Sequence, residues 1–118
     1  MPKAMKIKEI ANILNGKILS DANKLDMEVE YAFASDLMSD VLTTQTDGMV
    51  LLTGLANLQA IRTAEMSDIQ CVVFVRNKKV SDEMVELASE SGIVVIECKS
   101  SMFKASGLLY QQGLKPLF

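Results

Sequence analysis

Three short apolar runs constrain the fold of this chain more than any other feature. They occupy residues 49–52, 71–75 and 93–96. Runs of this length without polar alternation are typical of strands buried on both faces of a sheet. Each is followed by polar or glycine-containing residues and then by a helix-type pattern. We therefore expect an α/β domain with βα repeats, a mostly parallel central sheet and helices on both of its faces.

The helices after these runs are predicted from apolar residues at helical spacing. We expect one through Leu58 and Ile61, one over residues 81–90 and one over residues 102–111. Residues 113–118 are irregular in pattern but apolar enough to dock against the rest of the domain.

The N-terminal part has its own helix and strand signals. An apolar stripe predicts an amphipathic helix that ends at Asn15, with Gly16 as the favoured residue just past it. A short strand is expected at residues 17–20. The stripe consists of Ile7, Ile10, Ala11 and Leu14.

From residue 28 onward, apolar and polar residues alternate. Val29, Tyr31 and Phe33 fall on one face, as in a half-exposed strand. Ser35 and Asp36 end the alternation, and both are favoured N-cap residues for the helix pattern that follows.

The length of 118 residues, 49% of them hydrophobic, suits one domain with an ordinary core. We expect a single domain over residues 1–118. Within it, residues 1–27 form the N-terminal helix and short strand, 28–114 the α/β core and 115–118 a tail.

Several classes of enzyme are excluded by missing residues. The chain has no histidine and two cysteines, so we expect no metal site and no Ser-His-Asp or Cys-His pair. Its one Gly-Lys pair, at Gly16 and Lys17, lacks the rest of a P-loop, and GxGxxG is absent. We expect a protein without cofactor that is not an enzyme.

Charge and run length limit the partners. A net charge of -3 lacks the basic character of nucleic-acid-binding proteins. The apolar runs are far below the roughly 20 residues of a membrane span, and no apolar stretch follows the N-terminal lysines. We therefore expect a cytoplasmic protein that binds neither nucleic acid nor membrane.

Cysteines and methionines are interpreted first as packing residues. Cys71 and Cys98 are expected to be buried and reduced, with a redox thiol as the alternative. We assign Met38, Met49, Met66, Met84 and Met102 to the core. Methionine is also common at adaptable binding surfaces, so an apolar surface that dimerises is a further use of these residues.

Candidate ligand residues gather where the predicted strands end, because ligands of open α/β sheets bind outside the carboxyl ends of the strands. A glycine lets the backbone approach an anion closely, hydroxyl and amide groups donate hydrogen bonds, and basic residues supply counter-charge to phosphate. The candidates are Ser35, Asp36, Thr53, Gly54, Asn57, Arg76, Lys99 and Ser100, with Lys78 and Lys79 beside Arg76.

Each candidate also has a purely structural interpretation. Ser35, Asp36 and Asn57 are residues that cap helices, and Gly54 can simply turn the chain. Arg76, Lys78 and Lys79 can form a solvated loop. The ligand hypothesis rests on their convergence at one edge.

Residues 31–114 resemble the DRTGG domain family. The matching segments are ASD at 34–36, VLLTG at 50–54, DIQCVVF at 68–74, VELA at 85–88, GIVVI at 92–96 and KSSMF at 99–103. The start, IKEIANILNGK at 7–17, is similar to that of stand-alone members and of Mur ligase N-terminal domains.

The resemblance implies a fold like the N-terminal domain of HPr kinase/phosphorylase. Relatives of this kind are fused to CBS-domain pyrophosphatases and to phosphate acetyltransferases, where they accompany a catalytic domain. It therefore implies a regulatory, subunit-contacting role without kinase activity.

Our first hypothesis is a regulatory or scaffolding domain that forms a homodimer and contacts a metabolic or redox enzyme. The alternative is a small-molecule sensor that binds a nucleotide or other phosphate ligand at the strand-exit edge. A third is a small enzyme that uses Asp and Lys groups at the same edge.

Overall fold

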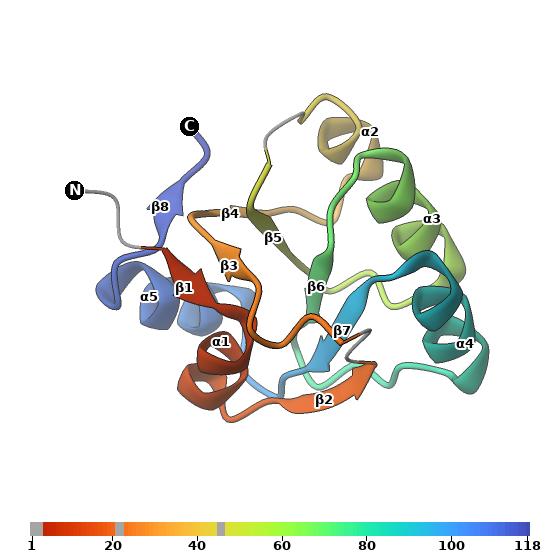
Figure 1. Ribbon diagram of the computed structural model, residues 1–118, viewed down its shortest axis with the longest axis horizontal. Helices are drawn as coiled ribbons and strands as arrows, with labels where there is room; N and C mark the ends of the chain where they lie inside the picture. The colour runs from red at the N-terminus through yellow and green to blue at the C-terminus, as the bar shows by residue number, and fades with distance from the viewer. Residues whose placement is uncertain (1–3, 21–22, 45–46) are drawn as a thin grey trace.

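The computed structural model describes residues 4–20, 23–44 and 47–118, which form a layered α/β domain. Its main sheet has six strands in the order β2-β7-β6-β5-β4-β8. Strands β4, β5, β6, β7 and β8 run parallel to one another. The edge strand β2 pairs with β7 in the antiparallel direction. The mostly parallel sheet and the helices on both faces confirm the predicted fold class (Figure 1).

The three apolar runs form strands, as predicted, and these strands lie next to one another within the main sheet. They are β5 (Met49–Thr53), β6 (Cys71–Phe74) and β7 (Val94–Glu97). Alternate residues point to opposite faces, so that Val73 joins one core cluster while Val72 and Phe74 join the other. Burial on both faces explains why no polar alternation appears in these runs.

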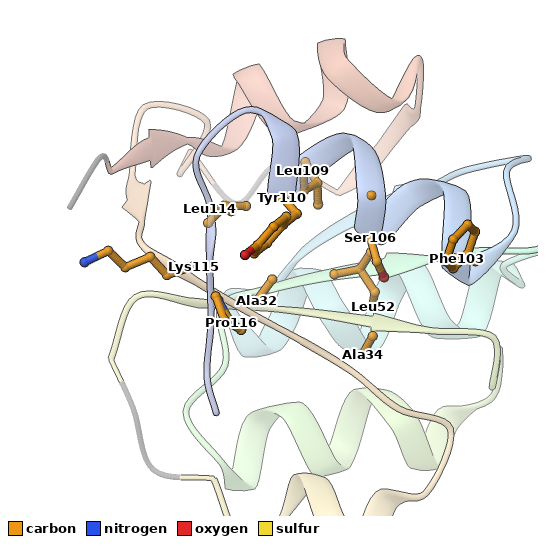
Figure 2. A pocket seen from close by; sticks show the side chains of 11 residues that line it. Ala32, Ala34, Leu52, Phe103, Ser106, Leu109, Tyr110, Leu114, Lys115 and Pro116 are labelled. Atoms are coloured by element: carbon orange, nitrogen blue, oxygen red, sulfur yellow. The ribbon is translucent and has the colours of Figure 1, made fainter. Parts of the chain in front are cut away.

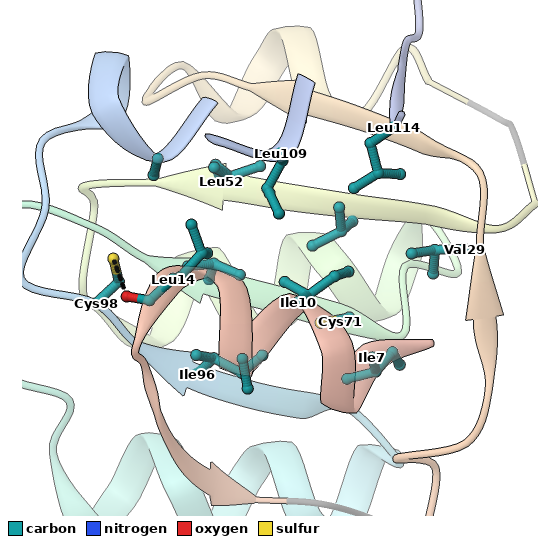
Figure 3. Close-up of a cluster of buried hydrophobic side chains, with 14 of the residues drawn as sticks. Ile7, Ile10, Leu14, Val29, Leu52, Cys71, Ile96, Cys98, Leu109 and Leu114 are labelled. Carbon is teal, nitrogen blue, oxygen red and sulfur yellow. Dashed lines mark hydrogen bonds between the residues drawn. The ribbon is translucent and has the colours of Figure 1, made fainter. Parts of the chain in front are cut away.

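Helices divide between the two faces. Helices α1 (Ile7–Leu14) and α5 (Met102–Gln111) cover one face, and α2 (Met38–Val41), α3 (Leu58–Met66) and α4 (Asp82–Ser91) cover the other. Figure 3 shows α1 and α5 packed over β5, β6 and β7. No helix in the described part of the chain is both long and apolar enough to cross a membrane.

Both cysteines are free and buried, as expected. Burial raises the pKa of the Cys71 thiol to about 12. The Cys98 thiol donates to the backbone oxygen of Leu14 at 3.8 Å, which ties the end of α1 to the sheet (Figure 3). Methionines Met38, Met49 and Met84 lie in the core, but the prediction for Met66 was wrong, because its side chain at the end of α3 is 68% exposed.

The end of α1 differs in one residue from the prediction. Asn15, not Gly16, takes the left-handed conformation, with φ 50°. Gly16 is required instead by packing, since a Cβ there would lie 2.6 Å from Ile96 Cγ2 and 3.0 Å from the Glu97 oxygen. The glycine lets the chain pass closely over the end of β7 into β2 (Lys17–Ser20).

The predicted half-exposed strand is two strands. β3 (Glu28–Val29) pairs with β1 (Met5–Lys6), whereas β4 (Tyr31–Ala34) joins the main sheet. Both Glu30 N and Tyr31 N donate to the Gly48 oxygen, which breaks the alternation between the two. Val29 therefore packs under α1, while Tyr31 and Phe33 pack on the opposite face, so their expected common face was wrong.

The C-terminal segment adds an edge strand where we expected irregular chain. β8 (Lys115–Pro116) lies parallel to β4, and Lys115 N donates to the Glu30 oxygen at 2.9 Å. Leu114, buried beside α5, anchors this strand. Residues 1–3 and 21–22 of the predicted N-terminal part lie outside the described residues.

Candidate ligand site at the strand-exit edge

The carboxyl ends of β4, β5, β6 and β7 lie along one edge of the sheet, because these strands are parallel. Ser35, Thr53, Arg76 and Lys99 follow or end these strands and are placed near this edge. The topology therefore brings the predicted exit segments together, and they divide into two separate groups.

The first group is centred on the Asp36 carboxylate. Its Oδ1 accepts hydrogen bonds from the Gly54 backbone N–H at 2.6 Å and from the Thr53 hydroxyl at 3.1 Å. Its Oδ2 lies 3.3 Å from a guanidinium nitrogen of Arg76. We call Asp36, Thr53, Gly54 and Arg76 the Asp36 network. It ties the ends of β4 and β5 to the loop that follows β6.

The backbone around Arg76 is held in an uncommon conformation. Arg76 and Asn77 both have positive φ, at 64° and 56°, where side chains larger than glycine are disfavoured. Arg76 N donates to the Ser100 oxygen at 2.8 Å and Asn77 N to the Cys98 oxygen at 3.1 Å. These two bonds fix the loop against the segment after β7.

Gly54 is explained by the same network. A Cβ at this position would collide with the Arg76 guanidinium, so the glycine makes room for that side chain. The Gly54 N–H and the Thr53 hydroxyl, the groups predicted to bind phosphate, both donate to Asp36. Asp36 thus occupies the position that an anion was expected to take.

The remaining polar candidates have local roles. Ser35 Oγ accepts from Leu37 N at 3.0 Å, and α2 begins at Met38 after Leu37 without a side-chain cap. The N-cap interpretation of Ser35 and Asp36 is therefore wrong, because Asp36 is drawn to Gly54 instead. Asn57 does cap α3, accepting from Ala60 N at 3.0 Å.

The second group is a polar pocket with a cavity volume of about 270 Å³. Four lysines from three segments line it, and we call it the lysine pocket. Asn15, Asn77, Glu97 and Cys98 complete its wall. The lysines are Lys17, Lys78, Lys79 and Lys99.

The charge of the lysine pocket is largely uncompensated. None of its four lysines belongs to an ion pair among the described residues, whose ion pairs involve Lys6, Lys8 and Arg76. The Glu97 carboxylate accepts from Val80 N at 2.9 Å, and this bond holds the loop before α4. A concave surface lined mainly by positive charges raises the local concentration of anions. The pocket is therefore suited chemically to a phosphate-bearing ligand.

The structure thus divides the predicted basic residues between the lysine pocket and the Asp36 network. Lys99, Lys78 and Lys79 meet in the lysine pocket, while Arg76 turns to Asp36. Sequence reasoning missed Lys17, which reaches this edge only because β2 runs antiparallel to β7 and pairs Lys17 with Glu97. Among the described residues, no group of three metal-ligating side chains could hold a metal ion.

A second cavity, of about 320 Å³, lies between α5 and the strands β4 and β8, and we call it the α5 groove. Its walls are mostly apolar (Figure 2). Sequence reasoning missed it, although Phe103, Gly107 and Tyr110 at helical spacing form an apolar stripe interrupted by a small residue. The lining residues are Ala32, Ala34, Leu52, Phe103, Ser106, Gly107, Leu109, Tyr110, Leu114, Lys115 and Pro116.

Comparisons with known proteins agree with this fold. The model of the DRTGG domain family matches residues 9–112. A similar solved structure contains the CBS and DRTGG domains of the regulatory region of Clostridium perfringens pyrophosphatase, complexed with the activator diadenosine tetraphosphate. Its TM-score is 0.76 at 15% identity, with 92% of this chain and 47% of that chain covered. The chain therefore spans about half of that structure. No curated protein matches the sequence.

Proposed function

Because the chain belongs to the DRTGG domain family, we propose that it is a non-catalytic regulatory domain that senses a nucleotide or related polyphosphate at the lysine pocket. The observation that carries this proposal is the convergence, on one concavity at the strand-exit edge, of four lysines that form no ion pair with any residue the structure describes. Regulation would follow if the bound ligand changed how the domain contacts a metabolic or redox enzyme.

Charge favours an anionic ligand at this place. The whole chain has a net charge of -3, yet Glu97 is the one acidic residue among those that line the lysine pocket. The four ammonium groups outnumber this one carboxylate by three, so positive charge is left over to balance the charge of a ligand. Lysine ammonium groups act as point charges toward phosphate.

Size favours the phosphate part of a nucleotide. Pockets for drug-sized ligands typically have about 300–1,000 Å³, so a cavity of about 270 Å³ suits a phosphate chain better than a whole nucleotide. The similar pyrophosphatase regulatory region was crystallised with a dinucleoside tetraphosphate activator. Diadenosine tetraphosphate is a chain of four phosphates that joins two adenosines, so it belongs to the ligand class proposed here.

Self-association is a second candidate function, favoured by a different observation. Phe103 and Tyr110 on α5 are 89% and 68% exposed at the rim of the α5 groove. Large aromatic side chains that gather beside an apolar groove are typical of interaction surfaces. The homodimer is therefore part of the proposal.

The ligand proposal is tested by titrating the protein with inorganic tripolyphosphate, ATP and diadenosine tetraphosphate while its unfolding temperature is measured. A ligand at a hundred times its Kd adds about 2.7 kcal/mol to the free energy of unfolding. We expect stabilisation of the wild type that weakens as salt is raised.

A variant of the lysine pocket tests where the ligand binds. It carries Lys78→Gln, Lys79→Gln and Lys99→Gln. Its matched control carries Lys6→Gln, Lys8→Gln and Arg62→Gln, which remove the same number of positive charges from residues that line neither the lysine pocket nor the α5 groove. We expect the variant to lose the stabilisation and the control to keep it. Equal stabilisation of both proteins, or none in the wild type, would refute the lysine pocket as a polyphosphate site.

A further inference from the structure

One face of the main sheet is covered less completely than the other. Three helices, α2, α3 and α4, pack on one face, whereas α1 and α5 are the helices packed on the opposite one. On that side, Ala32 and Ala34 of β4 line the α5 groove, and Ala34 is exposed. Parallel strands are normally covered on both faces, so the α5 groove is the place where one more helix would fit.

The α5 groove and its rim have complementary shapes. Phe103 lies toward one end of the α5 groove and Tyr110 toward the other (Figure 2). Gly107 lies between them in the sequence of α5. A Cβ at Gly107 would have no atom within 4 Å. Projecting rings and an open hollow therefore lie side by side on one surface.

We propose that the occupant of the α5 groove is α5 of a second copy of this chain, antiparallel to the first, with a two-fold axis near Gly107. A two-fold interface requires a surface that complements itself. Here each copy offers two aromatic side chains and a groove bordered by small residues, so each α5 fills the groove of the other. The absence of a side chain at Gly107 lets the two helices approach closely where they cross.

Charge selects the antiparallel arrangement. The sequence has no acidic residue after Glu97, so a lysine on α5 has no acidic neighbour on this segment. Around an axis at Gly107, Lys104 faces Tyr110 of the other copy, and an ammonium group over an aromatic ring is attractive. A parallel pair would instead bring Lys104 against Lys104.

The area is sufficient for a stable contact. Each aromatic side chain buries roughly 150–250 Å², so the four rings of two copies supply about half of the roughly 1,200–2,000 Å² of a specific interface. The walls of both grooves would supply the rest. This inference deepens the self-association part of the proposed function and is independent of the lysine pocket, which shares no residue with the α5 groove.

Sedimentation equilibrium at increasing protein concentration tests the proposal. We expect a wild-type dimer that Tyr110→Glu and Gly107→Leu each weaken at least tenfold. A Cβ at Gly107 meets no other atom within 4 Å, and an unchanged circular dichroism spectrum of Gly107→Leu distinguishes a lost dimer from a folding defect. Met66→Glu is the matched control, since Met66 is also 68% exposed but lies on α3.

Disulfide trapping tests the geometry. In the proposed dimer, the thiol of Gly107→Cys lies next to the same thiol of the second copy, across the two-fold axis. The thiol of Gln111→Cys would instead face Phe103 of the second copy. The native cysteines are buried and give little background. We expect air oxidation to link the Gly107→Cys chains and not the Gln111→Cys chains.

Three results would overturn the proposal. A wild-type monomer at high concentration would leave the α5 groove to a different protein. A dimer that Tyr110→Glu and Gly107→Leu do not weaken would lie on another face. Disulfide-linked Gln111→Cys without linked Gly107→Cys would contradict the antiparallel axis. Loss of polyphosphate binding in the lysine variant with the dimer intact would support the separation of the two sites.

Discussion

The Asp36 network makes a prediction that can be worked out bond by bond. In Asp36→Ala, the Gly54 N–H and the Thr53 hydroxyl lose their shared acceptor, and Thr53 is fully buried. A hydrogen bond to a charged group contributes about 1.5–3 kcal/mol. The ion pair with Arg76 adds at most about 1 kcal/mol, because both side chains are nearly half exposed. These contributions sum to about 3–7 kcal/mol. Because the Asp36 side chain is 45% exposed and water can replace part of its bonds, we expect Asp36→Ala to lower the free energy of unfolding by about 3–5 kcal/mol.

Asp36→Asn separates the two contributions. The amide oxygen still accepts from Gly54 and Thr53, but each bond to a neutral acceptor contributes about 0.5–1.5 kcal/mol, so the loss from the missing charge should be about 2–3 kcal/mol. Urea unfolding followed by circular dichroism measures both differences, and Arg76→Ala provides the matching loss of the ion pair alone. We expect the order of destabilisation to be Asp36→Ala, then Asp36→Asn, then Arg76→Ala with at most about 1 kcal/mol.

A chemical rescue asks whether Asp36 stands in for an anion. In Asp36→Ala, the Gly54 N–H, the Thr53 hydroxyl and the Arg76 guanidinium converge on a vacated position, so formate should restore part of the lost stability. Chloride at equal ionic strength should not, and the wild type should respond equally to both salts. If Asp36→Ala unfolds at the same urea concentration as wild type, the network contributes nothing and our account of Gly54 is wrong.

Two further predictions concern buried and crowded positions. Because burial raises the Cys71 pKa from 9.0 to about 12, the folded state keeps a proton that the unfolded state loses. The advantage of wild type over Cys71→Ala should be complete below pH 9 and shrink as the pH rises from there to about 12, by up to about 1.4 kcal/mol per pH unit. An unchanged difference would exclude this linkage. Gly16→Ala should cost about 1–3 kcal/mol because its Cβ meets Ile96 and the Glu97 oxygen. Gly107→Ala, in open space within a helix, should instead stabilise the monomer by about 0.5–1 kcal/mol, and similar effects at both positions would refute the packing argument.

The centre of the fold could be predicted because its signals are local. The apolar runs of β5, β6 and β7 carry their burial in consecutive residues, and Ser81, Asn57 and Ser101 are side-chain caps of the helices that follow them. Periodicity and capping depend on neighbours along the chain, so they are visible without the structure.

The edges of the sheet could not be predicted in the same way. Lys115 and Pro116 have no strand pattern. They form β8 because the Glu30 oxygen just before β4 and the Ala32 oxygen within it accept hydrogen bonds from this segment. The break between β3, which ends at Val29, and β4, which begins at Tyr31, likewise depends on another segment, because the Gly48 oxygen accepts from the backbone at this point. Such pairings arise only once the chain has folded.

Part of the grouping of the candidate residues could be predicted from the order of strands and loops. Lys78, Lys79 and Lys99 follow parallel strands and do line one pocket at the strand-exit edge, while ligand binding there stays a prediction from the rule for open α/β sheets. It could not tell that Asp36 bonds to Gly54, or that Lys17 arrives on an antiparallel strand. Both depend on strand direction and side-chain rotamers.

The two outer strands have a consequence for how this domain can assemble. Lys115 N and Leu117 N donate inward to the Glu30 and Ala32 oxygens, so Pro116 between them stands where an outward N–H would otherwise be. At the other edge, β2 is interrupted between Ile18 and Ser20. Proline and irregular edges discourage the addition of further strands. Both edges of the main sheet therefore discourage edge-to-edge aggregation, even with a core of Val, Ile and Leu strands, and this leaves the helices as the better surfaces for contact between copies.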